Sequence, residues 1–443
     1  PENSKKAPHR IVRGGLGPYQ AARKKAHMQA EVTGRRARRR ARTAEDGGEP
    51  ENSKKARGAL SEDRGIGLQL GSQGAGEETT VGGNTLVVVD TPGGGEGGAG
   101  IEQDNEGGGD VVDLDGRLLD GAGVERELEG YDMRKVHTLK LGGNTLNALP
   151  ERVRLAANLR VLDVHHFRGE IEEGFLEEDC LYLYCLWQLP KWIAELHGLQ
   201  KLSLGKNYSL GKTFQEVELG GLKGLTSLDL ASIGLSACPA WLEELTGLRT
   251  LNLSWNKRIG DSACWARLGV LTGLTDLDLS WIELDRIPPW LRELTGLEWL
   301  NLRGNRGLSR TVGAAELGGL TRLTDLNLCQ MDLCECPAWV GELTGLQTLD
   351  LSGNTGLSKT VGRARLESLT GLTELSLATT GLCECPAWLR ELTGLQTLDL
   401  NWNFELGKSV GRAGLGGLTG LTCLDLSHIE LVDCPLWVGE LTG

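Results

Sequence analysis

The chain repeats itself every 49 residues from about Leu196 to its end, and this period constrains the fold more than any other feature. The phrase Leu-Thr-Gly-Leu begins at Leu245, Leu294, Leu343 and Leu392, and a second series of the same phrase begins at Leu271, Leu320 (with Arg for Gly), Leu369 and Leu418. A 26-residue unit therefore alternates with a 23-residue unit. A fixed period of this size predicts a solenoid, because one such unit can bury its apolar side only against its neighbours.

Each unit contains a short alternating apolar pattern, which predicts a strand with every second residue buried. The pattern is a Leu-x-Leu pair, found at Leu251/Leu253, Leu277/Leu279, Leu300/Leu302, Leu326/Leu328, Leu349/Leu351, Leu375/Leu377, Leu398/Leu400 and Leu424/Leu426. The 23-residue unit continues through an apolar-Pro-x-Trp step, followed by apolar residues at three-residue spacing. That spacing fits a helical or 3₁₀ return.

The Leu-x-x-Leu-x-Leu core resembles the leucine-rich repeat family, over roughly residues 135–443. It is most similar to the intracellular plant, algal and bacterial subclass with a Leu-Pro-x-x-Leu return. The resemblance implies an α/β horseshoe with a parallel concave sheet and short helical or 3₁₀ convex returns. It also implies that the asparagine of each longer unit lies inside the coil and binds the neighbouring turn; these are Asn207, Asn256, Asn305, Asn354 and Asn403.

Three regions are expected. Residues 1–130 are basic and then Gly- and acid-rich, and this composition predicts that most of them are disordered. Residues 131–195 are predicted to form irregular N-terminal repeats, and residues 196–443 regular repeats that stop within a unit. We therefore expect the chain to be a fragment of a longer protein.

Charge is segregated along the chain. Residues 1–56 carry a net charge of +9, whereas the whole chain carries −13, so residues 57–443 carry −22. The run Arg35–Arg42 is interpreted as a solvated basic tail, with nuclear import or nucleic-acid binding as the alternative. We accordingly expect no nucleic-acid partner for the repeats.

No cofactor, metal site or catalytic constellation is predicted, and we expect no small-molecule substrate. The segment 86–93 resembles the Asp-x-x-Gly loop of GTPases, but Glu77 stands where the nearest upstream phosphate loop needs its lysine. The cysteines Cys238, Cys336 and Cys385 occupy an apolar position before proline, as does Cys434. Copies two turns apart are separated by about 9–10 Å, beyond the Cα reach of a disulfide, so these are expected to be core residues.

Reduced cysteines, without a secretory signal or a membrane span, favour a cytoplasmic protein, with a nuclear location through Arg35–Arg42 as the alternative. Half of the twelve tryptophans form one series, each two residues after a proline: Trp192, Trp241, Trp290, Trp339, Trp388 and Trp437. Their identical placement in every copy predicts a packing role.

The residues between the buried leucines are expected to form the concave surface. Their central row is acidic or amide-bearing, and aromatic residues interrupt the surface. The predicted partner-binding residues are Arg249, Asn252, Trp255, Asp276, Asp278, Trp281, Trp299, Asn301, Arg303, Asp350, Asp399, Trp402, Asp425 and His428. Tryptophan is enriched at interaction hot spots, which supports this choice. The alternative is that these polar side chains only keep a stacked sheet soluble.

Two functions remain open at this point. The first is a non-catalytic module that binds a protein or peptide of basic character on an acidic concave face, in recognition, defence or signalling. The second is a regulatory arm of a larger signalling enzyme, such as a ROCO-type GTPase, a nucleotide-binding immune receptor or a receptor kinase. Because residues 1–443 supply no enzyme domain by sequence, we favour the first.

Overall fold

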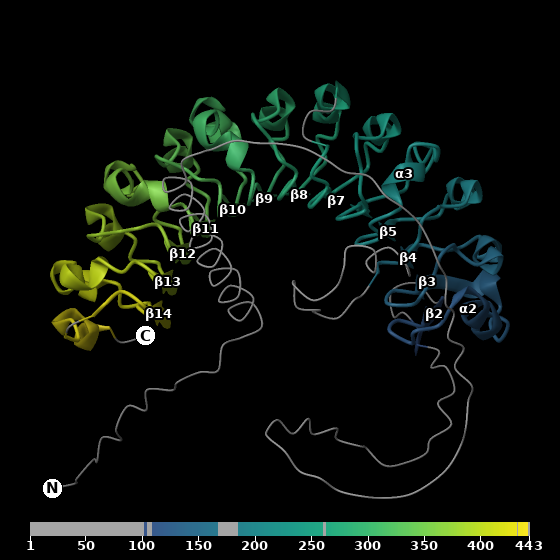
Figure 1. The fold of residues 1–443 in the computed structure, drawn as a ribbon, viewed down its shortest axis with the longest axis horizontal. Helices are drawn as coiled ribbons and strands as arrows, with labels where there is room; N and C mark the ends of the chain where they lie inside the picture. The colour runs from purple at the N-terminus through teal and green to yellow at the C-terminus, as the bar shows by residue number, and fades with distance from the viewer. Residues whose placement is uncertain (1–101, 104–108, 167–184, 260–262, 432, 442–443) are drawn as a thin grey trace, which may run out of the picture. The chain divides into compact units, whose positions relative to one another are not determined.

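The computed structural model describes residues 102–103, 109–166, 185–259, 263–431 and 433–441. Within residues 92–443 the strands form one sheet in chain order, from β1 to β14. β1 is antiparallel to β2, and every later pair of neighbours is parallel. The sheet lines the inner side of a curved solenoid (Figure 1). The predicted α/β repeat solenoid is therefore confirmed.

Most strands are three residues long, which is what a Leu-x-Leu pair between two bends permits. Their bounds are β1 Glu102–Gln103, β2 Asp110–Asp113, β3 Val136–Lys140, β4 Val161–Asp163, β5 Lys201–Ser203, β6 Ser227–Asp229, β7 Thr250–Asn252, β8 Asp276–Asp278, β9 Trp299–Asn301, β10 Asp325–Asn327, β11 Thr348–Asp350, β12 Glu374–Ser376, β13 Thr397–Asp399 and β14 Cys423–Asp425.

The strands pair in register, so that equivalent leucines form continuous rows. Leu251 of β7 pairs with Leu277 of β8, which pairs with Leu300 of β9. All three side chains are at most 2% exposed. Because strand neighbours alternate between the two faces, the residues on either side of each leucine face the inner side of the solenoid.

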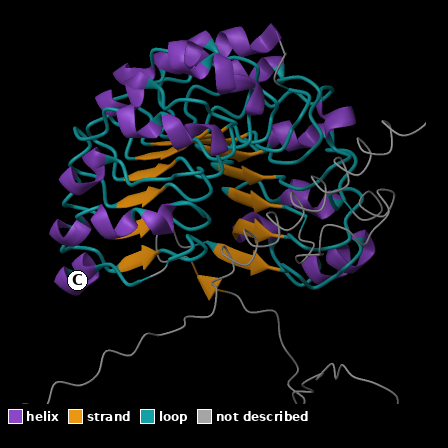
Figure 2. Ribbon diagram, turned by 60° about the vertical axis from the view of Figure 1, so that its left-hand side comes forward, coloured by secondary structure: helices purple, strands orange, loops and turns teal. Residues whose placement is uncertain are grey.

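The outer returns are almost all 3₁₀ turns, and they cover the side of the sheet away from its inner face (Figure 2). Their bounds are η1 Met133–Lys135, η2 Glu151–Leu155, η4 Lys191–Glu195, η5 Ala240–Glu244, η6 Ala263–Val270, η7 Pro289–Glu293, η8 Arg306–Arg310, η9 Val312–Ala314, η10 Leu317–Gly319, η11 Ala338–Glu342, η12 Thr355–Lys359, η13 Val361–Arg363, η14 Ala387–Glu391, η15 Leu406–Lys408, η16 Val410–Arg412, η17 Leu415–Gly417 and η18 Leu436–Glu440, with the α-helices α2 Gly121–Leu128 and α3 Gly211–Phe214.

The buried asparagine ladder is confirmed. The amide of Asn305 is fully buried, and its Nδ2 donates to the carbonyls of Leu279 and Leu302, both at 2.8 Å. Its Oδ1 accepts from the backbone N–H of Leu284 at 3.1 Å. Asn207, Asn256, Asn354 and Asn403 repeat the arrangement. Each asparagine thereby satisfies backbone groups of two successive turns that have no other route to water.

The packing role of the proline-adjacent tryptophans is also confirmed, since all six are 3–7% exposed. Nε1 of Trp339 donates to the carbonyl of Val312 at 2.8 Å, and Trp388 and Trp437 make the equivalent bond one and two double periods later. Trp241 instead packs edge-on against Phe214, with ring centroids 5.7 Å apart. We call these six residues the outer tryptophan ladder.

The cysteines before proline follow the prediction in three turns. Cys238 is buried, and Cys336 and Cys385 pack against the core, where burial raises the pKa of each thiol to about 12. Cys434, in the last described turn, is exposed and differs from the expected core position. In the earlier turns the cysteine has a core role because the following turn covers it.

The ordered repeats begin before residue 131, the predicted boundary. β2 and α2 lie within the range that composition predicted to be mostly disordered, and this expectation is corrected for residues 110–128. The reason is a degenerate strand: Val112 and Leu114 are fully buried at the positions that leucines occupy in later turns. The predictions for Arg35–Arg42 and for the GTPase-like segment lie outside the described residues, as does the disorder predicted for residues 1–101.

Candidate functional site

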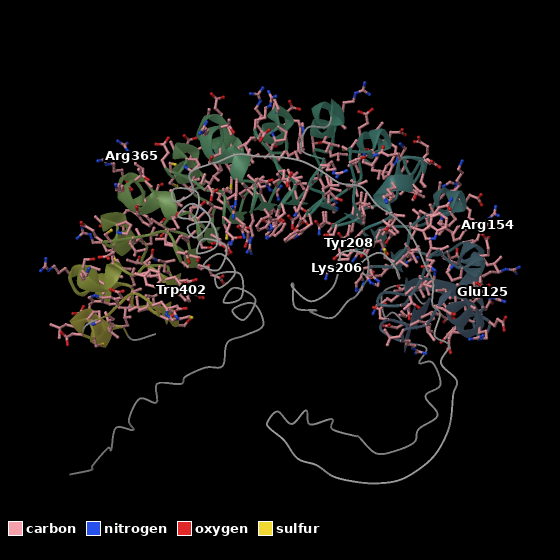
Figure 3. The ribbon with its side chains drawn as sticks, viewed as in Figure 1. Glu125, Arg154, Lys206, Tyr208, Arg365 and Trp402 are labelled. Carbon is pink, nitrogen blue, oxygen red and sulfur yellow. The ribbon has the colours of Figure 1, made fainter. Side chains whose placement is uncertain are left out.

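The inner face is organised into rows that run across the strands. The last residue of each strand from β6 to β14 belongs to what we call the carboxylate row: Asp229, Asn252, Asp278, Asn301, Asn327, Asp350, Ser376, Asp399 and Asp425. Three residues further along each turn lies the post-strand row, from β5 to β14: Lys206, Ser232, Trp255, Trp281, Gly304, Gln330, Gly353, Thr379, Trp402 and His428. Lys206 and Trp402 lie along the inner side, whereas Arg154 and Arg365 lie on the outer side (Figure 3).

Every residue of the post-strand row has a left-handed backbone. The φ angles are +61° at Trp255 and +56° at Trp281, and +76° at Gly304. A left-handed conformation costs a non-glycine residue about 1–2 kcal/mol, so glycine is the relaxed choice here. Because the same angle recurs at lysine, serine, glutamine and threonine, the repeat imposes it at each turn and the aromatic residues tolerate it.

Trp255 and Trp281 form a stacked pair, which we call the first aromatic pair. Their ring centroids are 4.9 Å apart with an interplanar angle of 21°. The next residue in the row is Gly304, where a Cβ atom would overlap the ring of Trp281. Each ring therefore leans towards the following turn, and Gly304 provides the space for the last one. Trp255 remains 44% exposed.

Trp402 and His428 form the second aromatic pair, six strands further along the sheet. Their centroids are 3.9 Å apart with an interplanar angle of 16°. Phe404 contacts Trp402 edge-on at 5.7 Å and is itself 46% exposed. Phe404 was not predicted as a site residue, although its position two residues after Trp402 is a signal that could have identified it.

Two carboxylates of the same row have opposite pKa shifts. Burial raises the pKa of Asp278 above its ordinary value, against hydrogen bonds from the Ser280 N–H at 2.8 Å and Asn301 Nδ2 at 3.2 Å. Burial also acts on Asp425, but bonds from the hydroxyl of Ser427 at 2.6 Å and from Asn401 at 3.0 Å leave its pKa lowered. Ionised Asp278 is therefore the costlier charge, and a bound cation would relieve that cost.

The charge of the inner face is unbalanced. Over β10–β14, the described residues of the strands and of the post-strand row include five carboxylates and no lysine or arginine: Asp325, Asp350, Glu374, Asp399 and Asp425. Elsewhere on the described solenoid some acidic residues form ion pairs, as in Arg154–Glu195 at 2.9 Å and Lys408–Glu405 at 2.6 Å. The described structure gives no such ion pair to Asp325 or Glu374, nor to Asp276 and Asp278 of β8.

Three further predicted site residues belong to neither aromatic pair. Trp299 is half-buried at the start of β9 and pairs in register with Asp276 and Asp325. Arg303 donates to Oε1 of Gln330 at 3.1 Å, so it is held on the post-strand row by a residue that the sequence analysis did not select. Arg249 is exposed and precedes β7, beside the sheet and outside both rows.

Two other polar features lie outside the predicted set. On the inner face near β4, His165 Nδ1 lies 2.7 Å from Asp163, and this bond raises the pKa of the histidine. On the outer side, a depression beside η13 and η14 is lined by charges of both signs, including Arg365, Arg390 and Glu391. Among the described residues, no group of three or more His, Cys, Asp or Glu side chains has an arrangement suited to a metal ion.

Comparison with solved structures identifies the architecture. Over 74% of this chain and 87% of its own length, a leucine-rich repeat protein from Leptospira interrogans superposes with a TM-score of 0.54 and 24% sequence identity. The chain has the leucine-rich repeat fold. An internalin from Listeria monocytogenes is also similar to this leucine-rich repeat solenoid, over 72% of the chain and 86% of its own length, with a TM-score of 0.48 and 19% identity.

A plant peptide hormone receptor solved with its peptide is similar at 19% identity, over 74% of this chain and 48% of the receptor, with a TM-score of 0.43. No protein-family model and no curated protein sequence matches the chain. The leucine-rich repeat subclass stays a prediction. None of the described helices is long and apolar enough to cross a bilayer.

Proposed function

We propose that this leucine-rich repeat chain is a non-catalytic interaction module that binds a basic protein or peptide segment on its inner face. The observation that carries the proposal is the run of carboxylates over β10–β14 beside exposed, stacked aromatic rings. Asp278 of β8 is partly buried, burial raises its pKa and the described structure gives it no ion pair, so a basic partner would supply the missing charge. Exposed tryptophan supplies apolar contact area that a polar rim does not.

The inner face is suited to binding the side chains of a protein or peptide rather than a small molecule. The described inner face has aromatic rings and carboxylates spread over many turns instead of converging on one point. Electrostatic attraction over such an area raises the association rate and favours a partner of positive charge. We therefore propose recognition, defence or signalling as its role, in the cytoplasm, where the nine described free thiols would stay reduced.

A charge-reversal experiment tests the proposal. Asp325→Lys with Glu374→Lys changes two inner-face carboxylates, and should weaken binding of an octa-arginine peptide by at least about tenfold. The matched control is Glu335→Lys with Glu384→Lys, which makes the same charge change at exposed loop positions of the same turns. Fluorescence anisotropy at two salt concentrations measures both. Equal weakening in the two double variants would overturn the inner face as the binding surface.

A further inference from the structure

The two aromatic pairs are discrete features of the post-strand row. Between them the row contains Gly304, Gln330, Gly353 and Thr379, so that no aromatic side chain occupies it from β9 to β12. The carboxylate row continues beneath this interval with Asp350 and other polar residues. The described post-strand row thus has two flat aromatic contact points, and the strands between them carry the carboxylates Asp325, Asp350 and Glu374.

The separation of the pairs follows from the sheet. Five strand spacings separate Trp281 at β8 from Trp402 at β13, six separate the centres of the two pairs, and seven separate Trp255 at β7 from His428 at β14. At 4.7–4.9 Å per spacing, the contacts lie about 24–34 Å apart along the sheet. An extended chain advances about 3.3 Å per residue, so about seven to ten residues span the distance.

The chemistry of each pair favours a planar cation. In each pair one ring is more exposed to a partner than the other. In the first pair this is Trp255, and in the second it is His428. Guanidinium groups stack on aromatic faces and also donate two parallel hydrogen bonds to a carboxylate, which an ammonium group cannot do in the same plane. Carboxylates lie on the same turns as both pairs, at Asp278 and at Asp425.

We propose that the inner face recognises two arginine side chains on one extended segment, one at each aromatic pair, about seven to ten residues apart. This inference rests on the proposed function and adds to it the identity of the anchoring side chains and their spacing. Two tethered contacts bind much more tightly than either alone only when the tether matches the distance between the sites. The spacing is therefore the property that an experiment can test.

Rigid peptides provide the measurement. Polyproline is a semi-rigid helix that advances 3.1 Å per residue with three residues per turn, so arginines 3, 9 and 15 residues apart lie on the same side at about 9, 28 and 47 Å. The three peptides are made with equal length and charge. Each peptide carries a dye and is titrated with the full chain, and the anisotropy of the dye reports binding. The peptide with the nine-residue spacing should bind at least about tenfold tighter than the other two.

Variants show whether the aromatic pairs are responsible. Trp255→Ala with Trp281→Ala, and separately Trp402→Ala with His428→Ala, should reduce the nine-residue peptide to the affinity of a single-arginine peptide. Trp187→Ala is the control, because this tryptophan is 52% exposed but lies on neither row. Replacing both arginines of the peptide by lysine should also weaken binding.

The outcomes separate this inference from the function beneath it. Affinity that depends on charge but not on spacing would overturn the two-arginine inference and leave a basic partner in place. Failure of every arginine peptide to bind would overturn both. Loss of the spacing preference in Trp187→Ala would mean that the aromatic pairs are not the anchors.

Discussion

Tryptophan occurs in two regions of the described chain, and the two sets differ in burial, in periodic placement and in backbone conformation. The outer tryptophan ladder is buried, follows proline in each double turn, and in three copies donates its N–H to a carbonyl of an earlier turn. The first aromatic pair is stacked and partly exposed on the inner side, at a backbone conformation that glycine would adopt more cheaply. Periodic placement with burial indicates stability, and aperiodic placement with exposure indicates recognition.

The largest effect is expected from truncation in the outer ladder. Trp339→Ala should lower the free energy of unfolding by about 3–5 kcal/mol, because it leaves a cavity between turns and removes the bond to Val312. Urea unfolding followed by circular dichroism measures the loss. Trp187→Ala, at an exposed position, should change stability by no more than about 0.5 kcal/mol. A loss below about 1 kcal/mol for Trp339→Ala would contradict the packing role.

A smaller effect separates the ring from its N–H. Trp339→Phe removes the donor to the Val312 carbonyl, which still accepts from Ala315, so about 0.5–1.5 kcal/mol should be lost beyond the change in volume. Trp241→Phe is the matched variant, because the Nε1 of Trp241 has no hydrogen-bond partner among the described residues. Thermal unfolding of the two variants should therefore place Trp339→Phe lower. Equal losses would show that the hydrogen bond contributes nothing measurable.

The inner pair should behave differently from the ladder. Trp255→Ala and Trp281→Ala should each cost less than about 1 kcal/mol of stability, since part of each ring is already hydrated. A double-mutant cycle should give a coupling of about 0.5–1.5 kcal/mol, the value expected for stacked aromatic rings. Single losses as large as that of Trp339→Ala would identify both residues as core.

The smallest expected effect is electrostatic and has opposite signs at two turns. The raised pKa of Asp278 means that its ionised form weakens the folded state, so Asp278→Asn should increase stability at pH 7. That gain should disappear as the pH falls through the raised pKa towards the unfolded value. The lowered pKa of Asp425 means that its ionised form stabilises the folded state.

Asp425→Asn should therefore decrease stability at pH 7, and this loss should disappear as the pH falls through the lowered pKa of Asp425. Chemical unfolding of both variants and of the parent chain, from about pH 7 to about pH 3, provides the comparison. Changes of the same sign at pH 7 would contradict the assigned environments of the two carboxylates.

The periodic part of this structure could be predicted from sequence, and the reason is redundancy. Leu251, Leu277 and Leu300 occupy the same position in successive repeats, so the strands, their register and the buried asparagines follow from the pattern. The sequence also places Trp255 and Trp281 at the same position of adjacent turns, and in the structure the two rings are stacked. The pattern did not reveal β2, where Val112 replaces the leucine of the motif.

Side-chain direction and local charge were not predictable. The Trp281 ring lies over Gly304 because the backbone at Trp281 is left-handed. The residue types of the post-strand row do not predict that conformation. The different pKa shifts of Asp278 and Asp425 depend on which neighbours donate to each carboxylate. Such information is three-dimensional, because it comes from residues of adjacent turns and from the depth of each side chain below the surface.

The in-register sheet also sets a scale of length. One 49-residue module adds two strands, which advance the inner face by about 9–10 Å, and an extended chain covers the same distance in about three residues. Gain or loss of one module between β8 and β13 would therefore shift the arginine spacing that the surface accepts by three residues while leaving both contact points unchanged. The number of modules would then set the length that the surface measures, and partner selectivity could change by recombination of whole modules without any substitution at either contact point.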